Sequence, residues 1–339
     1  MRYLTAGESH GTYLSGILEG FPAGIRITRD YISAQLRRRR LAPGRSPRQA
    51  KETDDFRIIS GMSGDVTTGA PICVLIPNAG RDLPPPSSLP RPGHADLAGM
   101  LKYGHRNAVL IRERASARET AARVALGSFA LRLHELLDIS INSRVVRLGG
   151  LSPVTAGGAA AEMLRARRNG DTLGGVFEVT AENLPAGLGG YSQWDSRLGA
   201  RLGAAMMGIN GVKGFEVGGG FALASSRGIE AMKDPELSGG LDGGMTNGRA
   251  LVLRCAVKPI PGLPAGAPSV DLKTFRKKLS VSLTSDITAV FAAAVVGEHM
   301  AALETAGALL EKFGGDSLSE IERRLNEWRK TTGKILARL

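Results

Sequence analysis

Two of the five histidines in this 339-residue chain lie in glycine-rich turns, where an imidazole could do acid–base chemistry. His10 belongs to Gly7-Glu8-Ser9-His10-Gly11, and His94 belongs to Arg91-Pro92-Gly93-His94-Ala95-Asp96, just before a predicted short helix. Imidazole changes charge near neutral pH, so it can give or accept a proton there. A single loop histidine is usually only solvated, and it is the pair that favours an acid–base site.

The first turn also matches the Gly-x-Ser-x-Gly pattern of serine hydrolases, which would make Ser9 a nucleophile. That motif requires a helix after the serine, whereas residues 13–19 alternate in the manner of a strand. We therefore prefer a glycine-walled pocket that presents His10. A purely structural turn and a hydrolase remain the alternatives.

A basic segment, residues 37–51, carries seven cations and no acidic residue, in a chain with a formal charge of +12. Arginine binds phosphate and carboxylate through two parallel hydrogen bonds. Nucleic acid is a weaker candidate, because the segment has no interleaved aromatic residues and no groove-reading helix is predicted. The segment predicts binding of a small phosphorylated and carboxylated metabolite, with a solvated cationic face as the alternative.

Several other classes of protein are disfavoured. The chain has neither a Gly-x-Gly-x-x-Gly motif between strand and helix nor a phosphate-binding Walker loop, and no metal-ligand spacing. No apolar run is long enough for a membrane span, and the first residues lack an apolar signal region. Cys73 and Cys255 lie in predicted strands and are expected to be buried thiols. We expect a cytoplasmic protein without a metal.

The elements that must hold these residues show an internal repeat. Gly7–Gly11 is followed at a fixed spacing by Phe21-Pro22-Ala23-Gly24-Ile25, and Gly170–Gly174 is followed at the same spacing by Leu184-Pro185-Ala186-Gly187-Leu188. Segments beginning at Thr67 and Thr246 also correspond. The repeat predicts one domain over residues 1–339 with related halves, roughly 1–150 and 165–315, and a C-terminal helix over 316–339.

Apolar patterns predict the secondary structure. Strands are expected over 13–19, 70–76, 176–180 and 250–257, and helices over 28–40, 116–137, 195–208, 286–313 and 317–334. The helix 116–137 carries alanine, glycine and serine on several faces, which predicts a central, closely packed position. Because helices and strands interleave, we expect a mixed, layered fold.

Taken together and in order, the motifs resemble those of the chorismate synthase family. The resembling pieces cover nearly the whole chain, and are Gly-Glu-Ser-His-Gly at 7–11, the arginine run with Gly44-Arg45, Arg-Pro-Gly-His-Ala-Asp at 91–96, Arg-Ala-Ser-Ala-Arg-Glu-Thr at 114–120, Gly-Asp-Thr-Leu-Gly-Gly at 170–175, Met-Gly-Ile-Asn-Gly-Val-Lys-Gly-Phe-Glu-Val-Gly at 207–218, Gly-Gly-Met-Thr-Asn-Gly at 243–248 and Lys-Pro-Ile-Pro at 258–261.

The resemblance implies an α+β fold, a β-α-β sandwich of two pseudo-symmetric halves with central helices. It implies a lyase of the shikimate pathway that removes phosphate and a C6 hydrogen from 5-enolpyruvylshikimate 3-phosphate by anti-1,4 elimination, giving chorismate. The family requires reduced FMN although the net reaction is redox neutral, and NADPH is a candidate reductant. A homotetramer acting on a small anionic substrate is expected, with no nucleic-acid or membrane partner.

The resemblance also implies residue roles. His10 would protonate the departing phosphate, and His94 would give a proton to, or stabilise charge on, the reduced flavin ring. Asp286 would work with flavin N5 in removing the C6 hydrogen. The hydrogen-bond relay would include Ser9 and Ser116. The substrate anions would be held by Arg39, Arg45, Arg48 and Arg118. The flavin would be wrapped by Arg114, Ala115, Ser116, Asn210, Gly211, Gly243, Lys258, Pro259, Ile260, Pro261, Gly262 and Thr284.

Two departures from the family pattern concern arginines. Thr284 and Val109 stand where the family usually has arginine. Arg106, Arg112 or the cluster at 276–278 could replace them. A protein that binds flavin or anions with weak or altered activity is therefore the alternative function.

Overall fold

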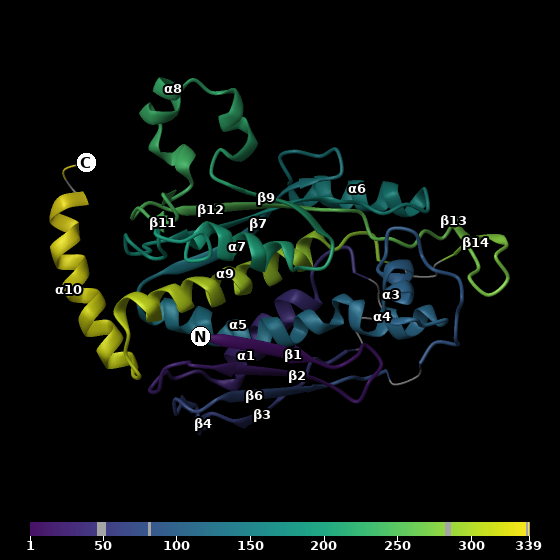
Figure 1. Cartoon of the computed structure of the whole chain (residues 1–339), viewed down its shortest axis with the longest axis horizontal. Coiled ribbons are helices and arrows are strands. Elements are labelled where there is room, and N and C mark those ends of the chain that lie inside the picture. Colours follow the sequence, from purple (N-terminus) through teal and green to yellow (C-terminus); the bar gives the residue numbers. More distant parts are fainter. Residues whose placement is uncertain (46–51, 81–82, 282–285, 337, 339) are drawn as a thin grey trace.

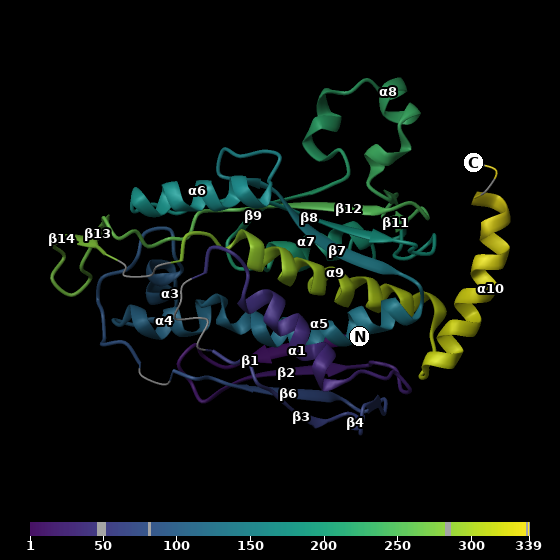
Figure 2. The ribbon, with the colours of Figure 1, turned by 180° about the vertical axis from the view of Figure 1, so that it is seen from behind.

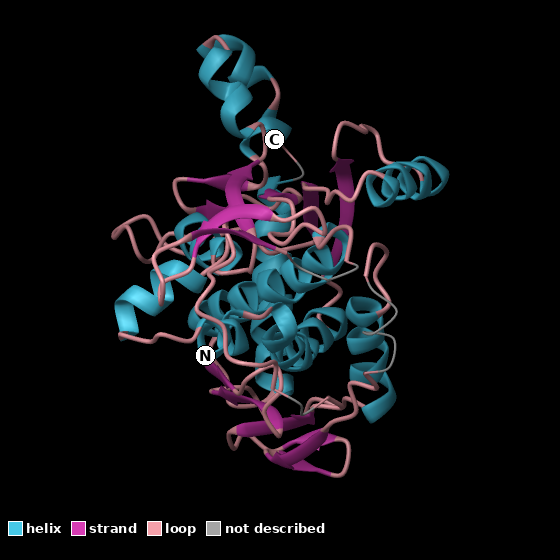
Figure 3. Ribbon diagram, turned by 90° about the vertical axis from the view of Figure 1, so that its right-hand side faces the viewer, coloured by secondary structure: helices cyan, strands magenta, loops and turns pink. Residues whose placement is uncertain are grey.

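The computed structural model describes every residue except 46–51, 81–82, 282–285, 337 and 339. Two antiparallel four-stranded sheets enclose a layer of helices, so the fold is α+β and has the predicted sandwich form (Figure 3). The strands are β1 (Arg2–Ala6), β2 (Tyr13–Glu19), β3 (Arg57–Ser60), β4 (Met62–Ser63), β5 (Val66–Thr67), β6 (Ile72–Pro77), β7 (Ser140–Leu148), β8 (Gly175–Glu182), β9 (Val212–Val217), β10 (Leu241–Asp242), β11 (Met245–Thr246), β12 (Leu251–Val257), β13 (Ala267–Val270) and β14 (Lys277–Ser280).

Helices of very different lengths complete the fold. They are α1 (Arg29–Arg40), α3 (Asp96–Tyr103), α4 (Ala108–Ala115), α5 (Thr120–Leu136), α6 (Ala156–Arg168), α7 (Leu198–Met207), α8 (Gly228–Lys233), α9 (Val290–Phe313) and α10 (Leu318–Leu336), with 3-10 turns η1 (Ala117–Glu119), η2 (Gly220–Ser225) and η3 (Pro235–Ser238). The four strands and five helices predicted from the sequence are confirmed, with ends that move by a few residues.

The first sheet has the order β1-β2-β6-β3, and the second has the order β7-β8-β12-β9. In each sheet one face is buried: Leu14 and Leu18 of β2, and Phe177 and Val179 of β8, are at most 1% exposed. This alternation is the period-two pattern that a sheet packed on one face requires.

The helices α1, α5, α7 and α9 lie between the sheets (Figures 1 and 2). α5 packs on the first sheet, α9 packs on the second, and the two helices pack against each other. Glycine permits this close approach, because a Cβ on Gly127 would lie 2.5 Å from Cβ of His299, and one on Gly297 would lie 2.5 Å from Phe177. The central, closely packed position predicted for the helix over 116–137 is confirmed.

Two buried threonines make the same contacts in corresponding places. Thr67 donates its hydroxyl to the Pro22 carbonyl at 2.7 Å and accepts from the Ile25 amide. Thr246 donates to the Pro185 carbonyl at 2.7 Å and accepts from the Leu188 amide. Each threonine thus fixes one of the Pro-Ala-Gly turns noted in the sequence.

Helix α10 closes one end of the sandwich. The amide of Leu318, its first residue, donates to the Ala23 carbonyl, and Trp328 Nε1 donates to the Ala186 carbonyl at 3.1 Å. It therefore touches both Pro-Ala-Gly turns. Among the described residues, none of the helices combines the length and the apolar character needed to cross a membrane.

Candidate active site

The turn that carries His10 connects β1 to β2. Gly7 has a φ of +107°, and a Cβ there would lie 2.4 Å from the Tyr13 carbonyl oxygen, so the strand ends approach too closely for a side chain. The residues after the turn form strand β2, whereas the Gly-x-Ser-x-Gly motif of serine hydrolases requires a helix there. The hydrolase alternative is therefore wrong, and the turn serves to present His10.

Glu113 of α4 holds His10 through two contacts. Its Oε1 lies 2.8 Å from His10 Nδ1, and its Oε2 accepts from the His10 backbone amide at 2.7 Å. The Glu113 carbonyl also accepts from the Ser9 amide at 3.0 Å. The carboxylate is buried, with its side chain 6% exposed, while that of His10 is 14% exposed. The imidazole is thereby fixed in orientation.

Asn78, at the end of β6, connects this turn to Arg118. Its Nδ2 donates to the carbonyls of Glu8 and Gly11, both at 2.9 Å, and its Oδ1 accepts from Arg118 Nε at 3.0 Å. Ser116 Oγ lies 3.3 Å from Ser9 Oγ. The turn, both serines and Arg118 therefore form one hydrogen-bonded group.

A buried cluster of arginines continues from Arg118. Asp54 accepts from Arg118 and from Arg39, whose Nη2 lies 3.1 Å from Asp54 Oδ2. Burial raises the pKa of the Asp54 carboxyl, but the charges of Arg39 and Arg118 lower it more, so the group is ionised. Burial, followed by the charge of Arg39, lowers the pKa of Arg45 to about 10.

This cluster has more donors than acceptors. Within the part of the chain that the structure describes, Arg39 Nε, Arg45 Nε and Arg118 Nη2 are buried without a hydrogen-bond partner. Buried polar groups are normally paired, and an unpaired one costs free energy. The arrangement is typical of a site that receives an anion.

Asp286 lies beside Arg45, whose pKa its charge raises. Gly44 brings the two segments together: its carbonyl accepts from the Ile287 amide at 2.8 Å, and its φ is +84°. A Cβ at this position would lie 2.4 Å from Thr288 Cγ2. Gly44 therefore fixes the backbone of the segment just after α1 against the segment that precedes α9.

His94 lies at the centre of a second network. Its Nδ1 lies 2.5 Å from Oδ1 of Asp96, which is fully buried. Arg112 Nε donates to Asp96 Oδ2 at 2.8 Å, and Arg91 contributes its amide and its Nε to the same oxygen. Burial raises the pKa of the Asp96 carboxyl, whereas hydrogen bonds from His94 and from the Arg91 amide lower it well below its usual range.

The residues assigned to the flavin form a third group. Asn210 Nδ2 donates to the Ala115 carbonyl at 3.1 Å, and the Lys258 amide donates to the Gly211 carbonyl at 2.9 Å. Lys258 Nζ donates to the Gly93 carbonyl, which ties this group to the His94 loop. Thr172 Oγ1 donates to the Ile260 carbonyl at 3.0 Å, positioning the segment Lys258–Gly262. Asn210 Oδ1 is buried and, among the described residues, has no partner.

Helix α4 connects all three groups. Arg112 contacts Asp96, Glu113 contacts His10, Arg114 donates to the carbonyls of Thr5 and Gly7, and Ala115 accepts from Asn210. The structure therefore brings together most of the residues selected from the sequence.

Three selected residues are not part of this assembly. Arg48 and Thr284 lie outside the described residues. Gly243 forms the β10–β11 turn, and the adjacent Gly244 lies against Gly190 and Arg197. This turn precedes β12 in the chain, whereas Lys258 follows the last residue of β12. The assignment of Gly243 to the flavin site is therefore not supported within one chain. Its φ of +59° instead serves the hairpin.

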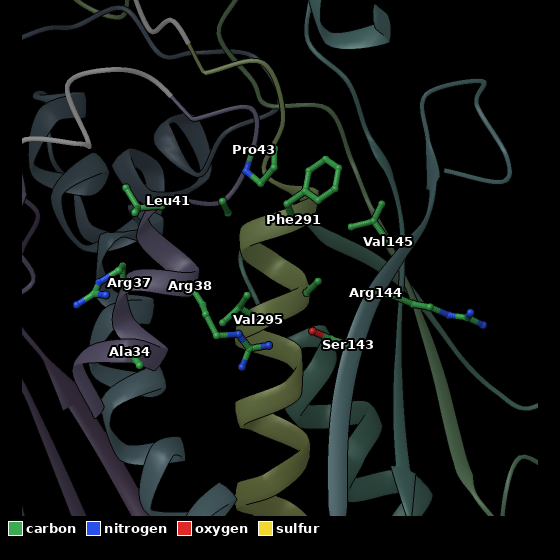
Figure 4. Close-up of a pocket in the computed structure, with 12 residues that line it drawn as sticks. Ala34, Arg37, Arg38, Leu41, Pro43, Ser143, Arg144, Val145, Phe291 and Val295 are labelled. Atoms are coloured by element: carbon green, nitrogen blue, oxygen red, sulfur yellow. The ribbon is translucent and has the colours of Figure 1, made fainter. Parts of the chain in front are cut away.

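A groove of about 600 Å³ between α1, α9 and β7 lies apart from these residues (Figure 4). Its lining is mainly apolar, and Arg37 and Arg144 point in opposite directions away from it. Arg38 is bound to buried Glu298, at 2.6 and 2.8 Å. Because its cations do not converge, the groove is not the anion site.

Sequence reasoning missed the carboxylates and the amide that hold the selected side chains: Asp54, Asn78, Asp96 and Glu113. Asp96 ends the motif at 91–96 and Glu113 precedes the motif at 114–120, but neither was given a role, and Asp54 and Asn78 lie outside the motifs. Their roles arise from contacts between segments far apart in the chain.

Comparison with known proteins gives the family. A family model described as chorismate synthase matches residues 1–310. The chain belongs to the chorismate synthase family. It is 44% identical to the chorismate synthase of Desulforudis audaxviator, over 95% of each chain, and 42% identical to that of Desulforamulus reducens, over 99% of this chain and 100% of the relative. A crystal structure of a chorismate synthase superposes with a TM-score of 0.80 at 34% identity, covering 97% of both chains.

This membership defines the class of reaction. The chain is a lyase that acts on carbon–oxygen bonds in aromatic biosynthesis, as chorismate synthases are. The similarity extends over nearly the full length, which supports the enzyme and not the alternative of a binding protein with weak activity. Membership also implies a requirement for reduced flavin.

Proposed function

We propose that this chain converts 5-enolpyruvylshikimate 3-phosphate to chorismate with reduced FMN bound beside the substrate. The observation that carries the proposal is the set of three buried guanidinium N–H groups, on Arg39, Arg45 and Arg118, that have no hydrogen-bond partner among the described residues. A phosphate and two carboxylates on the substrate would supply the missing acceptors. Charge-assisted, bidentate hydrogen bonds of this kind are the strongest available to side chains. Arg48 would add a further cation.

His10 is the proposed general acid. Glu113 accepts from its Nδ1–H, so the proton given to the leaving phosphate must come from Nε2 of the imidazolium form, and the neutral imidazole that remains keeps its hydrogen on Nδ1. Negative charge develops on the phosphate oxygen as the C–O bond breaks, and a proton delivered there lowers the barrier. The hydrogen bond between Ser9 and Ser116 would hold the turn that carries His10 against the segment that carries Arg118.

Asp286 and His94 are the proposed groups that move the other protons. Asp286, beside Arg45, would assist removal of the C6 hydrogen. His94 is held by Asp96 at Nδ1, and Arg91 Nη2 lies 3.1 Å from its Nε2. It would stabilise charge on the reduced flavin ring or, in its imidazolium form, give a proton to it. Reduced FMN, when bound, would supply the electron density that allows phosphate to leave from an otherwise unactivated position.

The residues present fit a flavin. The buried, unpartnered Asn210 Oδ1 could accept from an N–H or O–H of the cofactor. Lys258 could neutralise its phosphate or the electron-rich reduced ring. Arg114, Ala115, Ser116, Gly211 and the segment Lys258–Gly262 would complete the site, and the family resemblance also assigns Thr284 to it. NADPH is the proposed reductant.

We further propose that the chain is one domain of two related halves, that it forms a homotetramer in the cytoplasm, and that it binds no nucleic acid. The equal strand order of the two sheets and the matching contacts of Thr67 and Thr246 support the division into halves.

Anaerobic turnover tests the proposed reaction. Purified protein, reduced FMN and 5-enolpyruvylshikimate 3-phosphate should release inorganic phosphate and form chorismate, and the flavin absorbance should change when substrate is added. His10→Ala and His94→Ala should each lower kcat about 100-fold or more while the circular dichroism spectrum stays that of the wild type. A protein that binds flavin and substrate but releases no phosphate would contradict the proposed reaction.

A further inference from the structure

We infer that two adjacent residues of α4, Arg112 and Glu113, position both histidines and set the tautomer of each, so that one short helix fixes the two proton donors relative to each other. The inference rests on the proposed function, because it concerns residues assigned there as donors. Arg112 and Glu113 are positioning residues, since each acts through a histidine.

The His10 side of this arrangement is direct. A carboxylate can only accept, so the contact of 2.8 Å between Glu113 Oε1 and His10 Nδ1 requires a hydrogen on Nδ1. The second contact, from the His10 amide to Oε2, prevents the carboxylate from turning away. The neutral imidazole is thereby held with its hydrogen on Nδ1.

Arg112 acts on His94 indirectly, through the Asp96 carboxylate. Asp96 likewise accepts from His94 Nδ1, at 2.5 Å. Its other oxygen is held by Arg112 Nε at 2.8 Å, and Arg112 Nη2 also donates to the Leu89 carbonyl at 3.0 Å. Arg112 therefore fixes both the carboxylate and the loop that leads to His94.

Successive side chains of a helix project about 100° apart, so neighbouring residues can face two different segments. Arg112 and Glu113 do so, one toward the His94 loop and the other toward the His10 turn. Asn107 caps the start of α4 by accepting from the Val109 amide at 3.1 Å. Movement of the helix would displace both histidines together.

Helix α4 also contains Val109, one of the two positions where the family pattern has arginine. Val109, where the family pattern has arginine, is 2% exposed. Arg112 lies three residues later, one turn further along the same face of α4. Its guanidinium is used for Asp96 and the Leu89 carbonyl.

Nitrogen-15 NMR of protein labelled at its five histidines tests the inference without relying on activity. At a pH where the imidazoles are neutral, wild-type His10 and His94, assigned with the alanine variants, should both show a protonated Nδ1. Glu113→Gln should change the tautomer pattern of His10 alone, and Arg112→Leu should broaden or shift the signals of His94 alone. In turnover, each should lower kcat roughly 10- to 100-fold and change KM less than threefold.

Matched controls come from Glu178, a buried carboxylate of β8 held by Arg144 and Arg254. Glu178→Gln and Arg254→Leu make the same chemical changes and should leave both histidine patterns and kcat unchanged. If Glu113→Gln does not fold, Glu113→Asp, which keeps the charge but cannot make both contacts, should partly retain the His10 pattern.

Histidine patterns unaffected by the α4 substitutions, or all five disturbed alike, would overturn the inference. If the wild type has no turnover but the patterns respond as expected, the proposed function fails and the inference stands. If turnover is normal and the patterns do not respond, the inference fails and the proposed function stands.

Discussion

Nη2 of Arg39 lies 3.1 Å from Oδ2 of Asp54, and both side chains are at most 2% exposed. Asp54 is also bound by Arg118, and Arg45 lies close enough for the charge of Asp54 to raise its pKa. One buried carboxylate therefore compensates several buried cations.

Asp54→Asn should destabilise the protein strongly, because removing one partner leaves buried charges uncompensated. We expect a loss of about 3–5 kcal/mol in the free energy of unfolding, measured by urea denaturation at pH 7. Added inorganic phosphate should recover part of this loss, since an anion that binds only the folded state stabilises it.

Asp55→Asn provides the control for that prediction. Asp55 pairs with Arg29, but both side chains are more than half exposed. Exposed ion pairs contribute about 0–1 kcal/mol, so the loss should be small. Equal losses for the two variants would show that the buried cluster does not depend on Asp54.

Gly44→Ala should lower kcat and stability together. The positive φ and the distance of 2.4 Å to Thr288 Cγ2 leave no room for a Cβ, so the contact that places Asp286 beside Arg45 must shift. Phosphate release and thermal unfolding should both show the effect.

Two further variants separate backbone strain from steric contact at Gly44. Gly64 has a φ of +57° and no atom within 4 Å of an added Cβ, so Gly64→Ala should cost only about 1 kcal/mol. Thr288→Ser removes Cγ2 and should restore part of the activity of Gly44→Ala. A double variant no better than Gly44→Ala alone would refute the steric explanation.

His134 and His299 should make the protein less stable in mild acid. Both are fully buried, and burial lowers the pKa of each from 6.5 to about 4. Below pH 6.5 the unfolded chain takes up a proton that the folded chain does not, so stability is complete above this pH and falls as the pH decreases toward 4. The loss amounts to about 3 kcal/mol for each histidine.

The measurement compares the slope of unfolding free energy against pH, between pH 7 and 4.5, in the wild type and in His134→Gln and His299→Gln. Each variant should reduce this slope by an amount that corresponds to at most one proton taken up on unfolding. Because carboxylates also contribute to the slope, only the difference between proteins is informative. An unchanged slope would mean that these histidines are protonated in the folded state.

Thr67→Val and Thr246→Val should destabilise the protein by similar amounts. Each removes two hydrogen bonds to a buried Pro-Ala-Gly turn, at a cost of about 1–3 kcal/mol. The two sites share no partner, so the losses should add in the double variant. Clearly unequal losses, measured by urea denaturation, would argue against equivalent turns in the two halves.

The helices and strands were predictable because their patterns are local. The strand predicted from the alternation in residues 13–19 and the helix predicted over 28–40 are confirmed, and the Thr28 side chain caps that helix by accepting from the Tyr31 amide. Cys255 is buried as expected, whereas Cys73, on the outer face of its sheet, is only half-buried. Glycine residues indicate where a fold bends, but they do not show which bends lie together, and the assignment of Gly243 to the flavin site stays a prediction.

The candidate site was predictable only in part. His10 and His94 have recognisable surroundings, but Asp96 and Glu113 gain their importance from contacts that span the sequence. Arg112 illustrates the same limit. The sequence showed an extra cation in this region, and only the helix geometry shows which carboxylate it binds.

The packing of α5 against α9 has a consequence during synthesis on the ribosome. α5 ends at Leu136, but its helical partner ends at Phe313. At about 5–20 residues per second, the face of α5 that contacts α9 waits roughly 10–35 s for its cover. During this interval the nascent chain exposes alanine- and glycine-lined apolar surface, which favours aggregation until α9 has been synthesised.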